Sequence, residues 1–518
     1  MAFLIPLLLS FTHFLANSNA NPTTTITNIT TSSTNLTTTT DFPDLPDPSF
    51  DYAEITKQPF FVDKTDLLQA LFEPSDPSSK YPVHFITVPP NFGKTVNLNM
   101  IKQFVQIQLD SSKTPIPPNQ TNSYTLFSNL SIAQNKSIIQ DHLARYPVIS
   151  LDLLDIALLG LQAENILEEL HYRIQDSVEA FIGIDHLLEY FDQHGCTEDE
   201  DAELSEISFL ENLKNSALTE QQMEFALYML TKSYYQYFNK TKVIILITEY
   251  DHCALHYYRN NKESFVGVVY KIINQILKRT FDFAQDLLQF AVITSSSTLS
   301  YSLDCSMHDM ITHHAFLEEH RFTPYFGFTE TDLEHLFAVY KCEDKEKKII
   351  KDFYKGYQTT GKRLVYNPYS ITEYFKARNP DSKTHDLLKG YWKKTMHWEY
   401  VCLFLKNPVF RDKINTLLQS RQVQYSIRKL YDWNALFELE QLRDREYEES
   451  EDTHIDMYFT FYFELGLFSH TDQADVFGIP NNEAQLAYED ILRAYRTPKT
   501  TTTQKSFNST VTTLRATS

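Results

Sequence analysis

The sequence predicts an α/β fold, in which a parallel sheet with flanking helices is followed by a mainly helical C-terminal domain. Short apolar runs of strand length alternate with longer helical patterns as far as about residue 325, which is typical of strands joined by crossover helices. Beyond that residue such runs become rare and helical spacing dominates. The 518 residues are 42% hydrophobic and 22% charged, a globular composition long enough for two or three domains.

Four apolar runs are predicted to form the sheet, because each has the length and the continuous apolar character of a buried parallel strand. They are Tyr81–Val88, Tyr146–Leu153, Thr241–Ile247 and Leu288–Thr294. Helical spacing predicts helices around 94–109, 160–182, 205–238 and 264–279, and after the last strand around 329–340, 345–356, 384–395, 409–430 and 483–495.

The two ends of the chain differ from its middle. Residues 1–20 contain an apolar stretch too short to span a bilayer, followed by small residues, and predict a secretory signal peptide. No Lys or Arg precedes this stretch, and an N-terminal anchor or a buried strand is the alternative. Residues 21–48 and 497–518 are rich in Ser and Thr and predict disordered segments. Between them we expect an α/β domain at 49–325 and a helical domain at 326–496.

A signal peptide places the mature chain outside the cell, where N-x-[ST] sequons can carry glycans. Seven sequons begin at Asn28, Asn35, Asn119, Asn129, Asn135, Asn239 and Asn508. No later apolar run reaches the ~18 residues of a membrane span. The sequence therefore predicts a secreted glycoprotein without a membrane span after removal of the signal.

Charge and cysteine content exclude further classes of protein. The net charge of −21 argues against nucleic-acid binding, which depends on cationic contacts to phosphate. Five cysteines without a C-x-x-C pair supply neither a disulfide framework nor a zinc signature, and their odd number leaves at least one thiol free or paired between chains. The partner of the protein is not indicated by any residue pattern.

The segment PPNFGKT (Pro89–Thr95), between a predicted strand and a predicted helix, resembles a phosphate loop. Glycine lets backbone N–H groups approach phosphate, lysine neutralises its charge and threonine can bind Mg²⁺. The full motif needs glycine where this chain has Val88, and an ordinary strand-to-helix turn is the alternative. The candidate residues for ATP and Mg²⁺ are Asn91, Phe92, Gly93, Lys94 and Thr95.

A second apolar strand ends in acids, in the sequence VIILITEYD (Val243–Asp251). In P-loop proteins this strand supplies an Asp to Mg²⁺ and often a Glu that orients water. Here Thr248 stands at the Asp position, whereas Glu249 and Asp251 remain. The candidate catalytic residues are Glu249 and Thr294, the latter as a sensor of the γ-phosphate, and the candidate metal ligands are Thr95, Thr248 and Asp251. Together the motifs predict a P-loop NTPase-like sheet, with a plain sheet as the alternative.

Six motifs in order resemble the AAA-ATPase-like domain proteins over about residues 50–493. They are VPPNFGKT (Val88–Thr95), LITEYD (Leu246–Asp251), FGFTETD (Phe326–Asp332), FYKGY (Phe353–Tyr357), YNPYSI (Tyr366–Ile371) and IPNNE (Ile479–Glu483). FFVDK (Phe60–Lys64) also resembles the opening motif of the family. The resemblance implies a nucleotide-binding domain that uses ATP and Mg²⁺.

The sequence departs from the family pattern where the phosphates would bind. Val88, Pro90 and Asn91 stand where the family usually has arginines, and Thr248 replaces the acidic Mg²⁺ ligand. We therefore expect a degenerate nucleotide-binding scaffold that acts as a binding or effector protein. An active, Mg²⁺-dependent ATPase is the alternative, in which Arg321 either approaches the phosphates or is a surface residue.

Overall fold

The computed structural model describes ten stretches of the chain: 51–73, 83–153, 166–196, 204–252, 263–298, 311–379, 384–392, 405, 408–427 and 452–496. The predicted signal peptide and the two Ser/Thr-rich segments lie outside these stretches, as do the sequons at Asn28, Asn35 and Asn508 and three of the cysteines, Cys253, Cys305 and Cys402. Within the described stretches, no helix combines the length and the apolar character that a membrane crossing needs.

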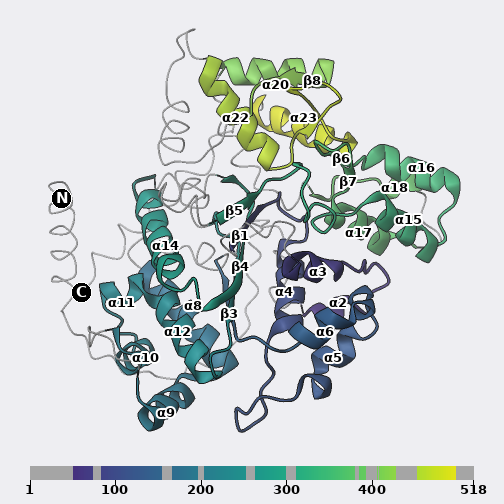
Figure 1. The fold of residues 1–518 in the computed structure, drawn as a ribbon. Coiled ribbons are helices and arrows are strands. Elements are labelled where there is room, and N and C mark those ends of the chain that lie inside the picture. The colour runs from purple at the N-terminus through teal and green to yellow at the C-terminus, as the bar shows by residue number, and fades with distance from the viewer. Residues whose placement is uncertain are drawn as a thin grey trace, which may run out of the picture. The chain divides into compact units, whose positions relative to one another are not determined.

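Five parallel strands form the main sheet (Figure 1). They are β1 (Val83–Thr87), β2 (Val148–Asp152), β3 (Val243–Thr248), β4 (Leu288–Ser295) and β5 (Ile311–His314), in the order β2-β3-β4-β1-β5. The four predicted strands are confirmed. The fifth was not predicted, because its sequence Ile-Thr-His-His lacks the apolar run of the others.

The order of the strands places the phosphate loop and the acidic strand end on the same edge of the sheet. Parallel strands present their carboxyl ends together, and β4 lies between β1 and β3. The loops that follow these three strands are therefore neighbours. This is the P-loop NTPase-like arrangement that the sequence predicts.

Helices cover the sheet, as predicted. They include α4 (Lys94–Val105), α8 (Ile166–Phe181), α9 (Ile184–His194), α10 (Glu206–Lys214), α11 (Glu220–Glu224), α12 (Ala226–Tyr237) and α14 (Glu263–Phe283). The segment predicted as helical at 205–238 is three helices. Ser216 adopts a positive φ of 53° after the first of them. Thr219 and Gln222 then form a reciprocal capping box that starts α11.

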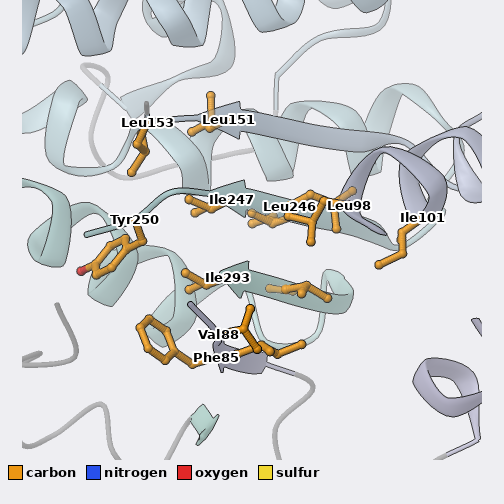
Figure 2. Close-up of a cluster of buried hydrophobic side chains, with 14 of the residues drawn as sticks. Phe85, Val88, Leu98, Ile101, Leu151, Leu153, Leu246, Ile247, Tyr250 and Ile293 are labelled. Carbon is orange, nitrogen blue, oxygen red and sulfur yellow. The ribbon is translucent and has the colours of Figure 1, made fainter. Parts of the chain in front are cut away.

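The core lies between the sheet and these helices (Figure 2). All residues of β1 and β3 are buried. Leu98 and Ile101 of α4 recur at the spacing of one helix face and pack beside β3. This packing fixes the start of α4, and hence the phosphate loop, against the sheet.

Further short helices lie around α4 and in residues 118–142, which contain three of the sequons. They are α2 (Tyr52–Ile55), α3 (Asp66–Phe72), α5 (Asn122–Phe127) and α6 (Lys136–His142), with the 3₁₀ helices η1 (Pro118–Gln120) and η2 (Ser131–Gln134). Asn119, Asn129 and Asn239 are exposed, whereas Asn135 is half-buried and caps α6 through its side-chain oxygen. Three of the four described sequons thus present their amide to solvent.

The region after residue 326 is mainly helical, as predicted. Its helices are α15 (Glu330–Val339), α16 (Asp344–Phe353), α17 (Pro368–Ala377), α18 (Thr384–Leu387), α20 (Pro408–Ser420), α22 (Asp452–Glu464) and α23 (Asn482–Arg496). Two small antiparallel sheets join them, β6 (Tyr357–Gln358) with β7 (Leu364–Val365), and β8 (Gln422–Gln424), β10 (Val476–Gly478) and β9 (Ser469–His470) in that order. The helix predicted at 409–430 ends at Ser420, because Arg421 turns the backbone with a φ of 59° into β8.

The residues after 326 belong to two apolar clusters. Twelve buried side chains between Phe328 and Leu387 form a small cluster of their own, whereas Tyr357 and Val365 in the same stretch belong to the cluster of the sheet. Those from Leu405 to Leu492, including Phe410 and Phe463, belong to the same cluster as the sheet. The C-terminal helices after residue 405 are therefore part of the core that holds the phosphate loop.

Candidate functional site

The phosphate loop joins the end of β1 at Thr87 to the start of α4 at Lys94. Two residues in it adopt left-handed backbone conformations, Asn91 with a φ of 66° and Gly93 with a φ of 89°. A side chain at Gly93 would meet nothing closer than the Asn97 amide at 3.9 Å. Glycine is therefore favoured there by its backbone conformation and not by lack of space.

The ammonium group of Lys94 is bound by other residues of the same chain. It donates to Ser296 Oγ at 2.8 Å, to the Val88 carbonyl at 3.2 Å and to the Pro89 carbonyl at 3.3 Å. It also pairs with Glu249 Oε1 at 3.5 Å. The residue is only 3% exposed. Because an ammonium group has three hydrogens to donate, these contacts use its whole capacity. Thr95, the next residue of α4, is half-buried.

The acids that follow β3 lie beside Lys94. Glu249 adopts a positive φ of 51°. Burial raises the pKa of its carboxyl group. The charge of Lys94 opposes this rise in pKa, and the charge of Asp251 adds to it. Asp251 is fully buried. Its two oxygens accept hydrogen bonds from Ser296 N at 2.9 Å and Ser297 Oγ at 3.0 Å. Asp251 therefore holds the chain after β4 in place.

Thr248, at the position of the Mg²⁺-binding acid, is buried, and its hydroxyl oxygen has no hydrogen-bond partner. A neutral hydroxyl offers Mg²⁺ no charge, although Mg²⁺ sites in proteins are usually built on carboxylates. Within the described stretches, no cluster of three His, Cys, Asp or Glu residues could hold a metal ion. Thr248 therefore offers no charged ligand for Mg²⁺ at the end of β3.

Thr294, the predicted sensor of the γ-phosphate, lies within β4. Thr294 is buried inside β4, and its hydroxyl faces the Ile247 carbonyl of β3 at 3.5 Å. The hydroxyl that contacts Lys94 belongs to Ser296, just after the strand. The polar residues at the end of β4 indicate that a hydroxyl lies near the phosphate loop. The sequence does not define the last residue of the strand closely enough to distinguish Thr294 from Ser296.

Phe92 connects the phosphate loop to the C-terminal region. Its ring is fully buried, and it packs edge-to-face on Phe316 at 5.2 Å and on Tyr357 at 5.4 Å. Gly327 of the FGFT motif lies against the same ring, since a side chain there would meet Phe92 Cδ1 at 3.3 Å. The sequence motifs at 88–95, 326–332 and 353–357 therefore meet around one aromatic side chain.

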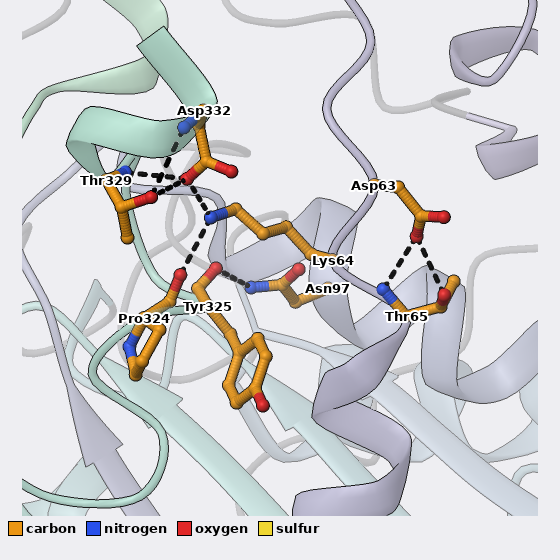
Figure 3. Close-up of polar contacts among 8 residues, drawn as sticks. All are labelled: Asp63, Lys64, Thr65, Asn97, Pro324, Tyr325, Thr329 and Asp332. Carbon is orange, nitrogen blue, oxygen red and sulfur yellow. Dashed lines mark hydrogen bonds and ion pairs between the residues drawn. The ribbon is translucent and has the colours of Figure 1, made fainter. Parts of the chain in front are cut away.

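Other motif residues that have no evident chemistry also contact one another. Lys64 of FFVDK donates to the Pro324 carbonyl at 2.7 Å and forms a close ion pair with Asp332, which caps α15 with Thr329 (Figure 3). Ser370 of YNPYSI donates to Glu483 of IPNNE at 3.0 Å. The Lys64 contacts join the N-terminal part of the chain to α15, and the Ser370–Glu483 contact joins α17 to α23 within the C-terminal region.

Arg321 does not contact the phosphate loop in the structure. Its guanidinium lies over the ring of Phe322 at 4.6 Å and donates to His84 Nε2 at 3.2 Å. It also lines a polar hollow of about 880 Å³, together with Asp66, Glu73 and Tyr325. None of the residues that line this hollow belongs to the phosphate loop or to the end of β3.

Among the residues that the structure describes, the cysteines and histidines do not gather into a second site. Cys196 and Cys342 are free thiols. His313 and His314 lie in β5, where neighbouring side chains point to opposite faces. His313 contacts Thr87 Oγ1 and His314 contacts His84. Burial lowers the pKa of His314 to about 2, so the imidazole stays neutral.

Comparisons with known proteins agree with the geometry. Residues 50–302 match the family model described as Predicted AAA-ATPase, whereas no curated protein matches the chain significantly. Two solved structures are similar to it: Cdc6p from Pyrobaculum aerophilum (10% identity, 88% of this chain and 97% of that chain, TM-score 0.28) and the ORC2 protein from Aeropyrum pernix in its ADPNP and ADP complexes (11%, 87% and 96%, TM-score 0.31). At these TM-scores the fold rests on the strand order of the sheet. The family match and that strand order together establish that this chain carries an AAA-ATPase-like domain of the P-loop type over residues 50–302.

Proposed function

We propose that this protein is a secreted glycoprotein that uses its AAA-ATPase-like domain as a scaffold for binding a protein partner, without a cycle of ATP hydrolysis. The observation that carries the proposal is the engagement of Lys94 by its own chain. A phosphate group would have to displace the Val88 and Pro89 carbonyls, the Ser296 hydroxyl and the Glu249 carboxylate from a buried ammonium group. Such buried polar contacts are costly to leave unmade.

Charge supports the same proposal. The phosphate loop has no arginine. Lys94 pairs with the acid Glu249, and Asp251 binds the backbone of Ser296, whose hydroxyl contacts Lys94. A triphosphate would add several negative charges beside these carboxylates. With Thr248 in place of an acid, the site also lacks the ligand that would bring Mg²⁺ to balance them.

The alternative is an active, Mg²⁺-dependent ATPase. It is supported by Gly93, Lys94 and Thr95, which hold the positions of a phosphate loop at the start of α4. Glu249 stands at the end of β3, where it could orient a water molecule. The two functions differ in whether Lys94 and Asp251 release their present partners when nucleotide is added.

Secretion is proposed from residues 1–20, which have the pattern of a signal peptide, and is supported by the exposure of Asn119, Asn129 and Asn239. Full-length protein made in a secretory eukaryotic cell is expected to appear in the medium with its N-terminus near residue 21. Its mass should exceed that of the chain and should fall after enzymatic removal of N-glycans.

The matched control is Leu8→Arg, which breaks the apolar stretch and is expected to keep the chain inside the cell. Retention of the unmodified protein in the cytosol, with residues 1–20 intact, would refute secretion. The proposal of a non-hydrolysing scaffold would survive that result, because it depends on the phosphate loop alone.

A further inference from the structure

The C-terminal end of α22 reaches the chain that follows β4. Glu464 is buried there, and its Oε2 accepts a hydrogen bond from Thr298 N at 3.0 Å, while Oε1 accepts one from the Thr298 hydroxyl. Thr298 lies two residues beyond Ser296, which binds Lys94. A carboxyl group from a segment 166 residues later in the chain thus occupies two donors beside the phosphate loop.

The residues around Glu464 approach the phosphate loop directly at Pro89 and indirectly, through Phe316, at Phe92. Gly466 has a φ of 79°, and a side chain on it would lie 3.1 Å from Pro89 Cβ and Cγ. The ring centroids of Phe463 and Phe316 are 6.3 Å apart, and the Phe316 ring in turn packs on Phe92. The turn is closed by a hydrogen bond from Gly466 N to the Phe463 carbonyl at 2.9 Å. The Phe463–Gly466 turn therefore packs against the start of the loop and supports its middle only through Phe316.

We propose that the Phe463–Gly466 turn is an autoinhibitory contact, which keeps the phosphate loop closed to Mg²⁺-ATP, and that Glu464 is the group that holds it closed. The proposal rests on the proposed function and names the regulation of the same site. Backbone amides and hydroxyls that end a strand beside a phosphate loop are donors of the kind that bind phosphate oxygens. With Glu464 on Thr298, those donors are occupied by the protein itself.

Glu464 blocks the site by occupying the donors and not by its charge. Burial raises the pKa of its carboxyl group to about 8, against the opposing effect of the Thr298 hydrogen bonds. At neutral pH the group is therefore mostly an uncharged acid. A glutamine, which has the same shape and can accept the same hydrogen bond from Thr298 N, should keep the loop closed.

The test compares Glu464→Ala with Glu464→Gln in the full-length protein, by calorimetric titration with ATP in excess Mg²⁺ at pH 7. The alanine variant frees Thr298 and is expected to bind ATP saturably at concentrations at least tenfold below the millimolar range in which the wild type shows no saturable heat. The glutamine variant should behave as the wild type does. Glu206→Ala is the matched control, because it also removes a buried acid, one paired with Lys232 of α12, away from the phosphate loop.

Cooperative thermal unfolding of each variant verifies that it is folded. If the alanine variant is not, Glu464→Asp replaces it, since a side chain shorter by one methylene cannot reach Thr298 and should also open the loop. Equal gains in the alanine and glutamine variants, or in Glu206→Ala, would overturn the proposal. So would the absence of any gain in a folded variant that has lost the Thr298 contact. That last result would leave the proposed function intact, because only binding by the wild type contradicts a non-hydrolysing scaffold.

Discussion

Replacement of Lys94 by methionine is expected to lower the free energy of unfolding of the nucleotide-free protein by about 3 kcal/mol. Methionine fills much of the same space but leaves the Glu249 carboxylate and the Ser296 hydroxyl without their shared partner. Removal of one member of a buried ion pair typically costs 3–5 kcal/mol, and the 18% exposure of the Glu249 side chain places the loss at the lower end. Denaturant unfolding measures it.

The loss of stability in Lys94→Met should be larger at pH 8 than at pH 5. Burial already raises the pKa of Glu249, and Lys94 is the group that opposes this rise. Without Lys94 the pKa rises further, so that the folded state holds a proton that the unfolded chain releases at about pH 4.5. Stability of the variant then falls as the pH increases through the pKa of the folded state. An unchanged difference between the two pH values would contradict this reasoning.

Lys214→Met is the control for the Lys94 experiment. Lys214 pairs with Asp185, but the two side chains are 46% and 77% exposed, and exposed pairs contribute little to stability. A Lys94 variant as stable as this control would show that Lys94 has no structural role. A lysine retained for a ligand would then be the better explanation.

Gly327→Ala is expected to have an effect of similar or greater size, about 4 kcal/mol, or to prevent folding. Gly327 has a φ of 107°, and an added Cβ would lie 2.3 Å from Val365 Cγ1 and 3.2 Å from the Tyr366 carbonyl. Overpacking of this kind costs ~1–3 kcal/mol, and the left-handed backbone adds ~1–2 kcal/mol for a residue with a side chain. The measurement is the midpoint and slope of denaturant unfolding.

Gly195→Ala separates the cost of overpacking from the cost of the backbone conformation. Gly195 also has a positive φ, of 80°, but an added Cβ there would meet nothing within 4 Å. Its replacement should therefore cost only the backbone part, ~1–2 kcal/mol. If Gly327→Ala were no more harmful than Gly195→Ala, the close packing of the FGFT motif on Phe92 and β7 would not be needed for stability.

The sheet was predictable because its strands carry their signal locally. Thr241–Ile247 is apolar and β-branched over its whole length, and β3 forms there. The strand at Ile311–His314 was missed, because its two histidines are held by Thr87 and His84 of β1. Such contacts form only when the strand pairs with β1, so the local sequence contains no pattern that predicts them.

The phosphate loop was predictable, but the groups that surround Lys94 were only partly so. Glu249 follows directly from the acid-ended strand motif. Ser296 depends on where β4 ends, which sequence patterns place only to within a few residues. Glu464 joins the site from α22, far along the chain. It has no motif of its own in the sequence, because its role comes from burial next to Thr298.

The account depends on the claim that the wild-type phosphate loop is held by its own chain and does not take up Mg²⁺-ATP. The most direct test is calorimetric titration of folded, full-length protein with ATP in excess Mg²⁺, with release of inorganic phosphate measured on the same sample. We expect no saturable heat up to millimolar ATP and no phosphate release above the rate without protein. Stoichiometric binding at micromolar ATP that is lost in Lys94→Met, together with phosphate release, would contradict the account and establish an ATPase.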